Sequence, residues 1–182
     1  LAEVLITLAI IGVIASMTLP GLMNKTNNAE MVAGVMKYQS VLSQAITKYE
    51  ADNGCIGDLS ACTVFEGDSD VIVWTALKPY FNVTNDCGLA AGQGCFAKGV
   101  TYKFLNGTDN DIFDNRTRNV KAILADGTAL LLQDNGGNCT TEYSQANKDP
   151  LVHVCGAIGI DINGSKGPNQ HGRDYFSWYI TR

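Results

Sequence analysis

Residues 1–20 read LAEVLITLAIIGVIASMTLP, an almost wholly apolar stretch that carries one charge, Glu3, and ends at a proline. Its leucine, isoleucine and valine residues occupy every face of a helix, and a helix that is apolar all round is buried in lipid or in a protein core. The nineteen residues before Pro20 would span roughly 28 Å as an α-helix, close to the roughly 30 Å hydrocarbon layer of a bilayer. We therefore expect residues 1–23 to form a hydrophobic helix that enters the membrane.

Two simpler interpretations of this helix fit the residues less well. A cleaved secretory signal has a basic start and a shorter apolar run, whereas the first basic residue here is Lys25. A plain membrane anchor has no use for Glu3, because a carboxylate inside an apolar helix is costly and usually functional. The chemically sensible partner for Glu3 is the free α-amino group of a chain terminus.

Residues 1–20 resemble the N-terminal segment of type IV pilins and type II secretion pseudopilins. Mature chains of that family begin with Phe-Thr-Leu, one variable residue and a glutamate, followed by an apolar helix. Residues 1–4, Leu-Ala-Glu-Val, match from the third family position onward, and Gly12 and Pro20 lie where the family has its glycine and proline. The family's Phe-Thr pair has no counterpart in this sequence, so the family's N-terminal methylation is assigned to no residue here.

The resemblance implies a structural subunit that waits in the inner membrane and then joins a helical homopolymer. It also implies two partners, a prepilin peptidase and an inner-membrane assembly platform. Glu3 would meet the terminal amine of a neighbouring subunit, so Glu3 and Leu1 are the candidate assembly residues, and the helix between Gly12 and Pro20 would unwind in the fibre. We favour an extracellular type IV pilus; a short periplasmic type II secretion pseudopilus and a membrane-anchored binding module are the alternatives.

A second helix is predicted directly after the first. Pro20 should kink the chain, because proline removes a helical hydrogen bond and crowds the preceding turn. Gly54 reads as the end of the helix. We thus divide the chain into a hydrophobic helix over residues 1–23, an amphipathic helix over residues 24–54 and a globular domain over residues 55–182. An apolar stripe with steps of three or four residues supports the amphipathic helix: Val32, Val35, Tyr38, Leu42, Ala45 and Tyr49.

The globular domain carries the signals of an antiparallel sheet. Apolar runs on both sides of Asp126-Gly127 predict a β-hairpin, and hairpin-joined strands imply antiparallel pairing. A long N-terminal helix packed on such a sheet is an α+β fold, and it is also the pilin fold that the resemblance implies. A brief helix, interrupted at Pro79, is predicted within residues 74–81. The predicted strands are residues 100–105, 119–125, 128–133, 151–162 and 175–180.

Six cysteines, an even number, indicate an exported and oxidised domain. The sequence has no Cys-x-x-Cys pair, and His153 and His171 are its two histidines, so the cysteines fit neither a zinc site nor a c-type haem. Six cysteines can pair in many ways. Proximity along the chain favours three short loops, Cys55–Cys62, Cys87–Cys95 and Cys139–Cys155.

Charge and motifs argue against two other classes of protein. The formal net charge of −5 disfavours a general nucleic-acid-binding role, since phosphate recognition needs a basic surface. The sequence has no nucleophile elbow and no metalloprotease motif. We therefore expect no enzymatic activity and no required cofactor.

Residues 161–174, DINGSKGPNQHGRD, form a candidate calcium site. Oxygen-bearing side chains alternate at the start, as in an EF-hand loop, but the later glycine and glutamate of an EF-hand are missing. Calcium accepts irregular sets of oxygens, and the candidate ligands are Asp161, Asn163 and Asp174. The stretch is similar to the C-terminal part of major pseudopilins, some of which bind calcium near their last loop. The alternative is a turn-rich connection between strands.

Asn-x-Ser/Thr triplets are more frequent than composition predicts. Six occur, whereas chance would give about two. We predict glycosylation of an exposed surface, with Asn82, Asn106 and Asn115 as candidate sites; an unmodified chain is the alternative. The other triplets begin at Asn24, Asn138 and Asn163.

Overall fold

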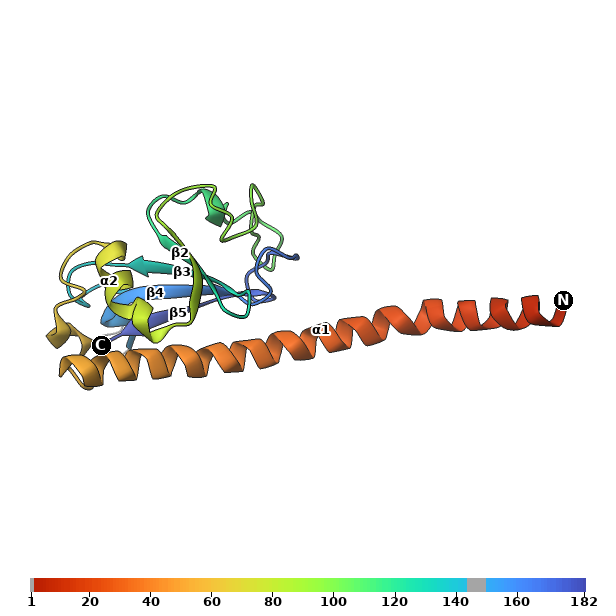
Figure 1. Cartoon of the computed structure of the whole chain (residues 1–182), viewed down its shortest axis with the longest axis horizontal. Coiled ribbons are helices and arrows are strands. Elements are labelled where there is room, and N and C mark those ends of the chain that lie inside the picture. Colours follow the sequence, from red (N-terminus) through yellow and green to blue (C-terminus); the bar gives the residue numbers. More distant parts are fainter. Residues whose placement is uncertain (1, 144–149) are drawn as a thin grey trace. The chain divides into compact units, whose positions relative to one another are not determined.

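The computed structural model describes residues 2–143 and 150–182, except for the side chains of residues 19–26 and of Pro150. The chain divides into two compact units, Leu1–Lys37 and Tyr38–Arg182. Helix α1 (Ala2–Asn53) makes up the described part of the first unit and opens the second. Figure 1 shows its ribbon in red and orange.

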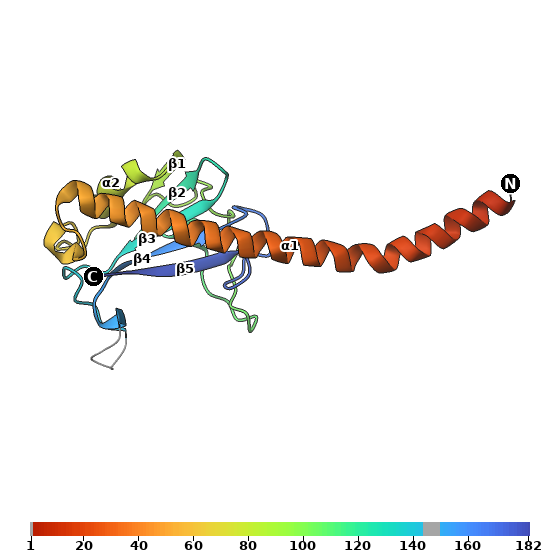
Figure 2. The same cartoon turned by 90° about the horizontal axis from the view of Figure 1, so that it is seen from below.

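The second unit contains an antiparallel sheet, which confirms the predicted α+β class. In the described part of the chain the sheet has five strands in the order β1-β2-β3-β4-β5, so neighbours in sequence are neighbours in space (Figure 2). The strands are β1 (Val83–Gly88), β2 (Val120–Leu124), β3 (Ala129–Asp134), β4 (Val154–Asp161) and β5 (Tyr175–Thr181). The other described elements are helix α2 (Asp70–Leu77) and the short 3-10 helices η1 (Leu59–Cys62), η2 (Lys78–Tyr80), η3 (Phe113–Asn115) and η4 (Pro150–Val152).

Strand β3 is buried on both faces of the sheet. Successive side chains of a strand point to opposite faces, and Leu130 and Leu132 join one hydrophobic cluster while Ala129 and Leu131 join another. The part of α1 from Tyr38 onward covers the first face, and the loops of residues 89–118 cover the second, on opposite sides of the strands in Figure 1. The fold therefore has a core on each side of its sheet.

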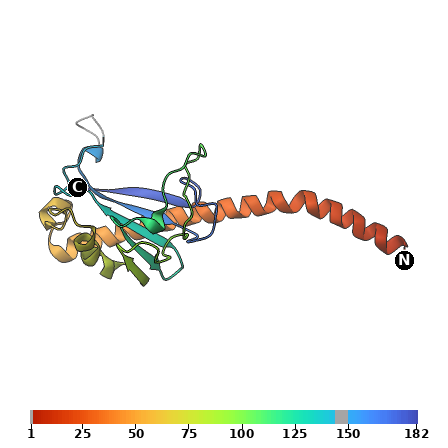
Figure 3. The same ribbon diagram turned by 90° about the horizontal axis from the view of Figure 1, so that it is seen from above.

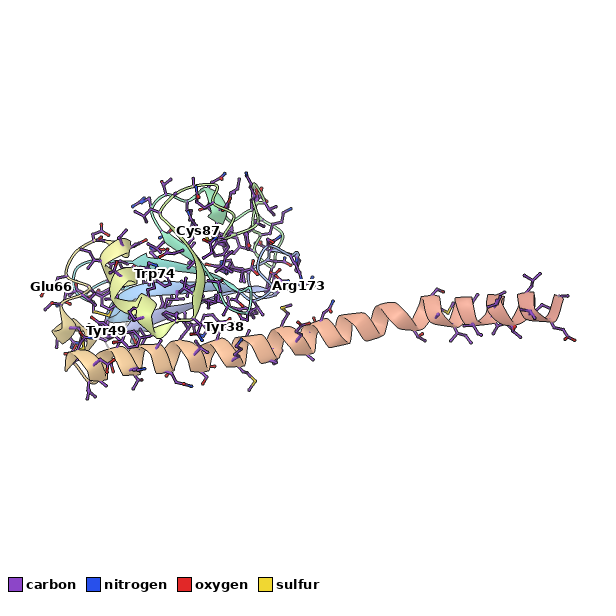
Figure 4. All side chains as sticks on the ribbon, in the orientation of Figure 1. Tyr38, Tyr49, Glu66, Trp74, Cys87 and Arg173 are labelled. Atoms are coloured by element: carbon purple, nitrogen blue, oxygen red, sulfur yellow. A yellow bond between two sulfur atoms is a disulfide. The ribbon has the colours of Figure 1, made fainter. Side chains whose placement is uncertain are left out.

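Helix α1 contributes one buried face to the first core. Tyr38, Leu42, Ala45 and Tyr49 are buried at steps of three or four residues, and Figure 4 shows the labelled Tyr38 and Tyr49 on the part of α1 beside the strands. The predicted amphipathic stripe is confirmed from Tyr38 onward. Val32, a more N-terminal member of the predicted stripe, is 60% exposed. Figure 3 views the same strands from above.

The second core is aromatic. Phe96, Tyr102, Phe113 and Tyr175 are all buried in it, with Phe113 4.5 Å from Tyr102 and 4.6 Å from Tyr175 between ring centroids. Aromatic pairs in such tilted and edge-on arrangements stabilise a core beyond their buried area. This cluster holds otherwise irregular loops on the sheet.

The predicted hairpin is confirmed. β2 and β3 pair antiparallel around Asp126-Gly127, with Ile123 opposite Ala129. Gly127 has φ +87°, a left-handed conformation that glycine adopts without strain. The last two predicted strands are also confirmed, as β4 and β5.

The predicted strand over residues 100–105 is wrong. The main chain of Tyr102 instead bonds to Asn110 and Asp111 within one loop. Lys103 forms only isolated bridges, to Asp109 and Gln170. The alternation that suggested a strand reflects one ring, Tyr102, that enters the aromatic core.

Strand β1 has no counterpart among the predicted strands. Its sequence, VTNDCG, is polar and rich in residues that are depleted in strands. The strand exists because its main chain pairs with β2, with irregular register between Val83 and Asn85 and between Asp86 and Gly88. Such pairing is not visible in local composition.

The predicted end of the second helix is confirmed, and the predicted brief helix is found in part. α1 ends at Asn53, and Gly54 follows with φ +74°, as expected for a glycine after a helix. The predicted brief helix over residues 74–81 appears as the end of α2 followed by η2. Gly12 lies inside α1. The predicted kink at Pro20 falls on residues whose side chains are outside the described part of the chain, and it stays a prediction.

The six cysteines pair as proximity along the chain favours. The disulfides are Cys55–Cys62, Cys87–Cys95 and Cys139–Cys155. Each closes a short loop, with sequence separations of 7, 8 and 16 residues. Figure 4 labels Cys87, which precedes the glycine-rich loop that its disulfide closes.

Helix α2 offers a matched test of the first core. Leu77 is fully buried in that core and Ile72 on the same helix is 57% exposed. We expect Leu77→Ala to lower the free energy of unfolding by roughly 2–5 kcal/mol, because it removes buried apolar contacts and leaves a cavity. Ile72→Ala should cost less than about 1 kcal/mol. Chemical denaturation followed by circular dichroism measures both, and equal losses would contradict this description of the core.

Candidate functional site

The candidate calcium loop connects β4 to β5. Asp161 is the last residue of β4 and lies opposite Tyr175, the first residue of β5. The side chains of Asp161 and Asp174 are both fully buried. The antiparallel pairing thus brings the two ends of residues 161–174 together.

Asp174 closes this loop. Its carboxylate accepts hydrogen bonds from the main-chain nitrogens of Asn169 and Gln170, each at 2.7 Å. Its carbonyl oxygen accepts one from the nitrogen of Ile162 at 2.9 Å. Asp174 therefore joins both halves of the loop, and its carboxylate faces main-chain amides.

Three buried side-chain oxygens in the same loop accept no hydrogen bond. They are Asp161 Oδ1, Asn163 Oδ1 and Asn169 Oδ1. Asn163 uses its amide nitrogen to donate to the carbonyl of Gly167 at 3.1 Å, which leaves its oxygen free. A buried acceptor without a partner costs about 1–3 kcal/mol, so these three oxygens are acceptors that a cation or a hydrogen-bond donor could use.

These oxygens suit a hard cation. Calcium binds carboxylate and amide oxygens and main-chain carbonyls in irregular sets. Among the described residues, no group of three or more His, Cys, Asp or Glu side chains could hold a metal, so a cation here would depend on amide oxygens as well as carboxylates. Two of the predicted ligands, Asp161 and Asn163, offer free oxygens, and Asp174 supports the loop. Asn169 was missed, because its sequence context reads only as a turn.

Tyr102 approaches the site from the aromatic core. Its hydroxyl donates a hydrogen bond to Asp161 Oδ2. Removal from solvent and the charge of Asp174 raise the pKa of the Asp161 carboxyl, to about 7. The hydrogen bond from Tyr102 and the main-chain amides of Asn163 and Gly164 act in the opposite direction. A bound cation would favour the ionised carboxylate.

The N-terminal residues form a separate candidate site, for assembly. Glu3 is exposed in the first turn of α1, and Leu1 lies outside the described residues. A Cβ atom added at Gly12 would meet nothing within 4 Å. Large apolar side chains of this segment are 54–77% exposed. They are Val4, Leu5, Ile6, Leu8, Ile10, Ile11, Val13, Ile14 and Met17. A search of the described residues finds no helix with the length and apolar character needed to cross a membrane.

A polar cavity of about 490 Å³ lies beside α2 and β3. Its buried carboxylates are Asp70 and Asp134, and burial raises the pKa of both. Asp70 accepts from the Asp134 nitrogen at 2.6 Å and from Asn119 at 3.1 Å. Asp134 accepts from the nitrogens of Ser69 and Gly136 at 2.9 and 3.0 Å. Each oxygen has a donor, so these carboxylates serve the fold.

The predicted glycosylation sites lie on the surface. Asn82, Asn106 and Asn115 are exposed, whereas Asn138 and Asn163 are half-buried. The side chain of Asn24 lies outside the described part of the chain, and glycosylation stays a prediction.

Comparisons with known proteins found no matching family model, no similar curated protein and no similar solved structure. Two features of the described residues bear on function: the exposed apolar segment of α1 and the buried free oxygens of the loop between β4 and β5.

Calcium should stabilise the protein through this loop. We expect added calcium to raise the melting temperature of the full chain in detergent, with about 2.7 kcal/mol of stabilisation at 100 times the Kd. Asn163→Ala should weaken this effect, because it removes one free oxygen, whereas Asn82→Ala at an exposed position should not. Differential scanning calorimetry with calcium and with a chelator measures the effect. An unchanged melting temperature at millimolar calcium would exclude the site.

Asp161 should also make the metal-free protein sensitive to pH. Its pKa is about 7 in the folded chain, against an ordinary value of 3.8. The folded state therefore holds more protons than the unfolded state between these values, so stability should fall as pH rises from about 4 to about 7 and then level off. Urea unfolding in a chelator at several pH values tests this. Asp161→Asn should flatten the profile, and an equally steep profile in that variant would assign the trend to other groups.

Proposed function

We propose that this protein is a structural subunit of a type IV pilus, which assembles through its N-terminal helix into an extracellular filament. The observation that carries the proposal is the exposure of the large apolar side chains between Val4 and Met17. An isolated soluble chain rarely exposes so much contiguous apolar surface. The resemblance of residues 1–20 to pilins supplies the identity of the surface that covers them, which is the same segment of neighbouring subunits.

The cohesion of such a filament would come from apolar burial. Removing one large aliphatic side chain from water contributes roughly 1.5–3 kcal/mol, and the segment exposes several on every side. The hydrophobic effect is non-directional, so it favours association without fixing how far one helix slides along the next. A second interaction must set the register.

Glu3 provides that interaction. It is the one charged residue among residues 1–20, and in a filament core it would be removed from water. An ion left buried without its partner costs several kcal/mol, whereas pairing with the terminal amine of a neighbour offsets this cost at one register. Before assembly, the same apolar segment would hold the subunit in the inner membrane.

The candidate calcium loop favours the alternative within the same class, a type II secretion pseudopilus. The resemblance associates calcium near the last loop with major pseudopilins, and Asp161, Asn163 and Asn169 offer free oxygens there. Both alternatives use the N-terminal helix in the same way. They differ in filament length and location, which are directly measurable.

Glu3→Ala should leave the subunit in the membrane fraction and reduce filament yield strongly, because the register of the helices is lost. Glu30→Ala is the matched control, since Glu30 is also exposed on α1 and lies outside the apolar segment. The measurement is electron microscopy and immunoblotting of filaments sheared from cells that express the chain with its assembly machinery. Long surface filaments would support the pilus, and short periplasmic ones the pseudopilus. Wild-type yield from Glu3→Ala would refute the pairing, and monomers alone from the wild-type chain would refute the filament.

A further inference from the structure

We propose that Tyr102 is a positioning residue for calcium, which fixes the Asp161 carboxylate so that one oxygen faces the ion. This inference rests on the calcium site proposed for the loop between β4 and β5. Tyr102 lies far from that loop in sequence and is not one of its ligands.

The hydrogen bond from Tyr102 to Asp161 makes the two oxygens of the carboxylate different. The Tyr102 hydroxyl donates to Oδ2, while Oδ1 is buried without a full hydrogen bond, and the nearby main-chain amides of Asn163 and Gly164 lower the pKa of the carboxyl. A carboxylate held at one oxygen cannot turn freely about its last bond, so the free oxygen keeps its direction. In metal sites, residues that hydrogen-bond to a ligand commonly fix the orientation of that ligand.

The Tyr102 side chain is itself held firmly. It is fully buried, and its ring lies 4.5 Å from that of Phe113, 5.7 Å from that of Tyr175 and 6.0 Å from that of Phe96 between centroids. Its main chain bonds to Asp111 and Asn110, each at 2.8 Å. The hydroxyl is thus presented by a packed ring on a closed loop rather than by a mobile side chain.

The residues after Tyr102 run along the second half of the calcium loop. The nitrogen of Lys103 donates to the carbonyl of Asn169 at 3.1 Å, and the carbonyl of Lys103 accepts from the nitrogen of His171 at 2.8 Å. Gln170 donates from its side chain to the carbonyl of Phe104 at 2.9 Å. One short segment therefore supports two residues with free oxygens, Asp161 through the phenol and Asn169 through the main chain.

Tyr102→Phe tests the proposal because it keeps the ring and removes the hydroxyl. We expect it to weaken calcium binding about 10–100-fold, the usual effect of losing such a supporting group. Tyr175→Phe is the matched control: Tyr175 is buried in the same aromatic cluster, and its hydroxyl makes no hydrogen bond to Asp161 among the described contacts. The Kd of this variant for calcium should change less than about threefold, since the hydrogen bond to Asp161 is kept. Calorimetric titration of the full chain in detergent with calcium chloride measures the Kd of folded protein.

This measurement separates positioning from simple stabilisation. A residue that only stabilises the fold would lower the melting temperature in a chelator and leave the Kd of the folded protein unchanged. A wild-type Kd in Tyr102→Phe, or an equal loss in Tyr175→Phe, would overturn the proposal while the calcium site stands. Absence of calcium binding by the wild-type chain would instead overturn the site, and this inference with it.

Hydrogen exchange on the wild-type chain gives a test that does not depend on how the variants fold. Coupling between two sites is reciprocal, so calcium should slow exchange at the amides of Tyr102 and Lys103, which lie in the supporting segment. The amides of α2, in the other core, should slow only by the amount that the overall gain in stability accounts for. Unchanged exchange at Tyr102 and Lys103 in saturating calcium would contradict the proposal.

Discussion

The apolar character of β3 on both of its faces constrains the whole second unit. A strand with leucines on both faces needs a packed layer on each face, because otherwise it exposes apolar surface to water. Helix α1 covers one face from Tyr38 onward, and the aromatic loops cover the other. The second cover consists of loops, whose buried members include the rings of Phe96, Tyr102 and Phe113 and the Cys87–Cys95 disulfide.

The aromatic core under these loops also lies beside the candidate calcium site. The rings of Tyr102 and Tyr175 belong to the core beneath the loops, and Asp161 ends the strand beside them. A carboxylate at this position is removed from water by the same packing that stabilises the sheet. The burial of Asp161 is therefore a consequence of the core's position, and the hydrogen bond that holds its carboxylate comes from Tyr102, a residue far away in sequence.

Features that depend on neighbouring residues could be predicted from the sequence, and features that depend on contacts between distant residues could not. The Asp126-Gly127 hairpin and the end of α1 at Gly54 depend on local chemistry, so the sequence alone sufficed. β1 depends on pairing with β2, and the loop around Tyr102 depends on contacts with Asp111 and Asn169; neither has a local signature. Asp161 and Asn163 were predictable as oxygen donors with metal-loop spacing. Asn169 and Tyr102 were not, because a free buried oxygen and its supporting donor exist only once the chain has folded.

All three disulfides close short loops, and every cysteine lies after Gly54 in the chain. No covalent crosslink therefore joins α1 to the sheet that it covers. If a filament of such subunits is stretched, the load between helix and sheet rests on the packing of Tyr38, Leu42 and Tyr49 and on hydrogen bonds such as that from Tyr38 to Asp126, at 2.6 Å. Such contacts re-form after they part, so a filament built in this way would yield under tension and recover without breaking a covalent bond.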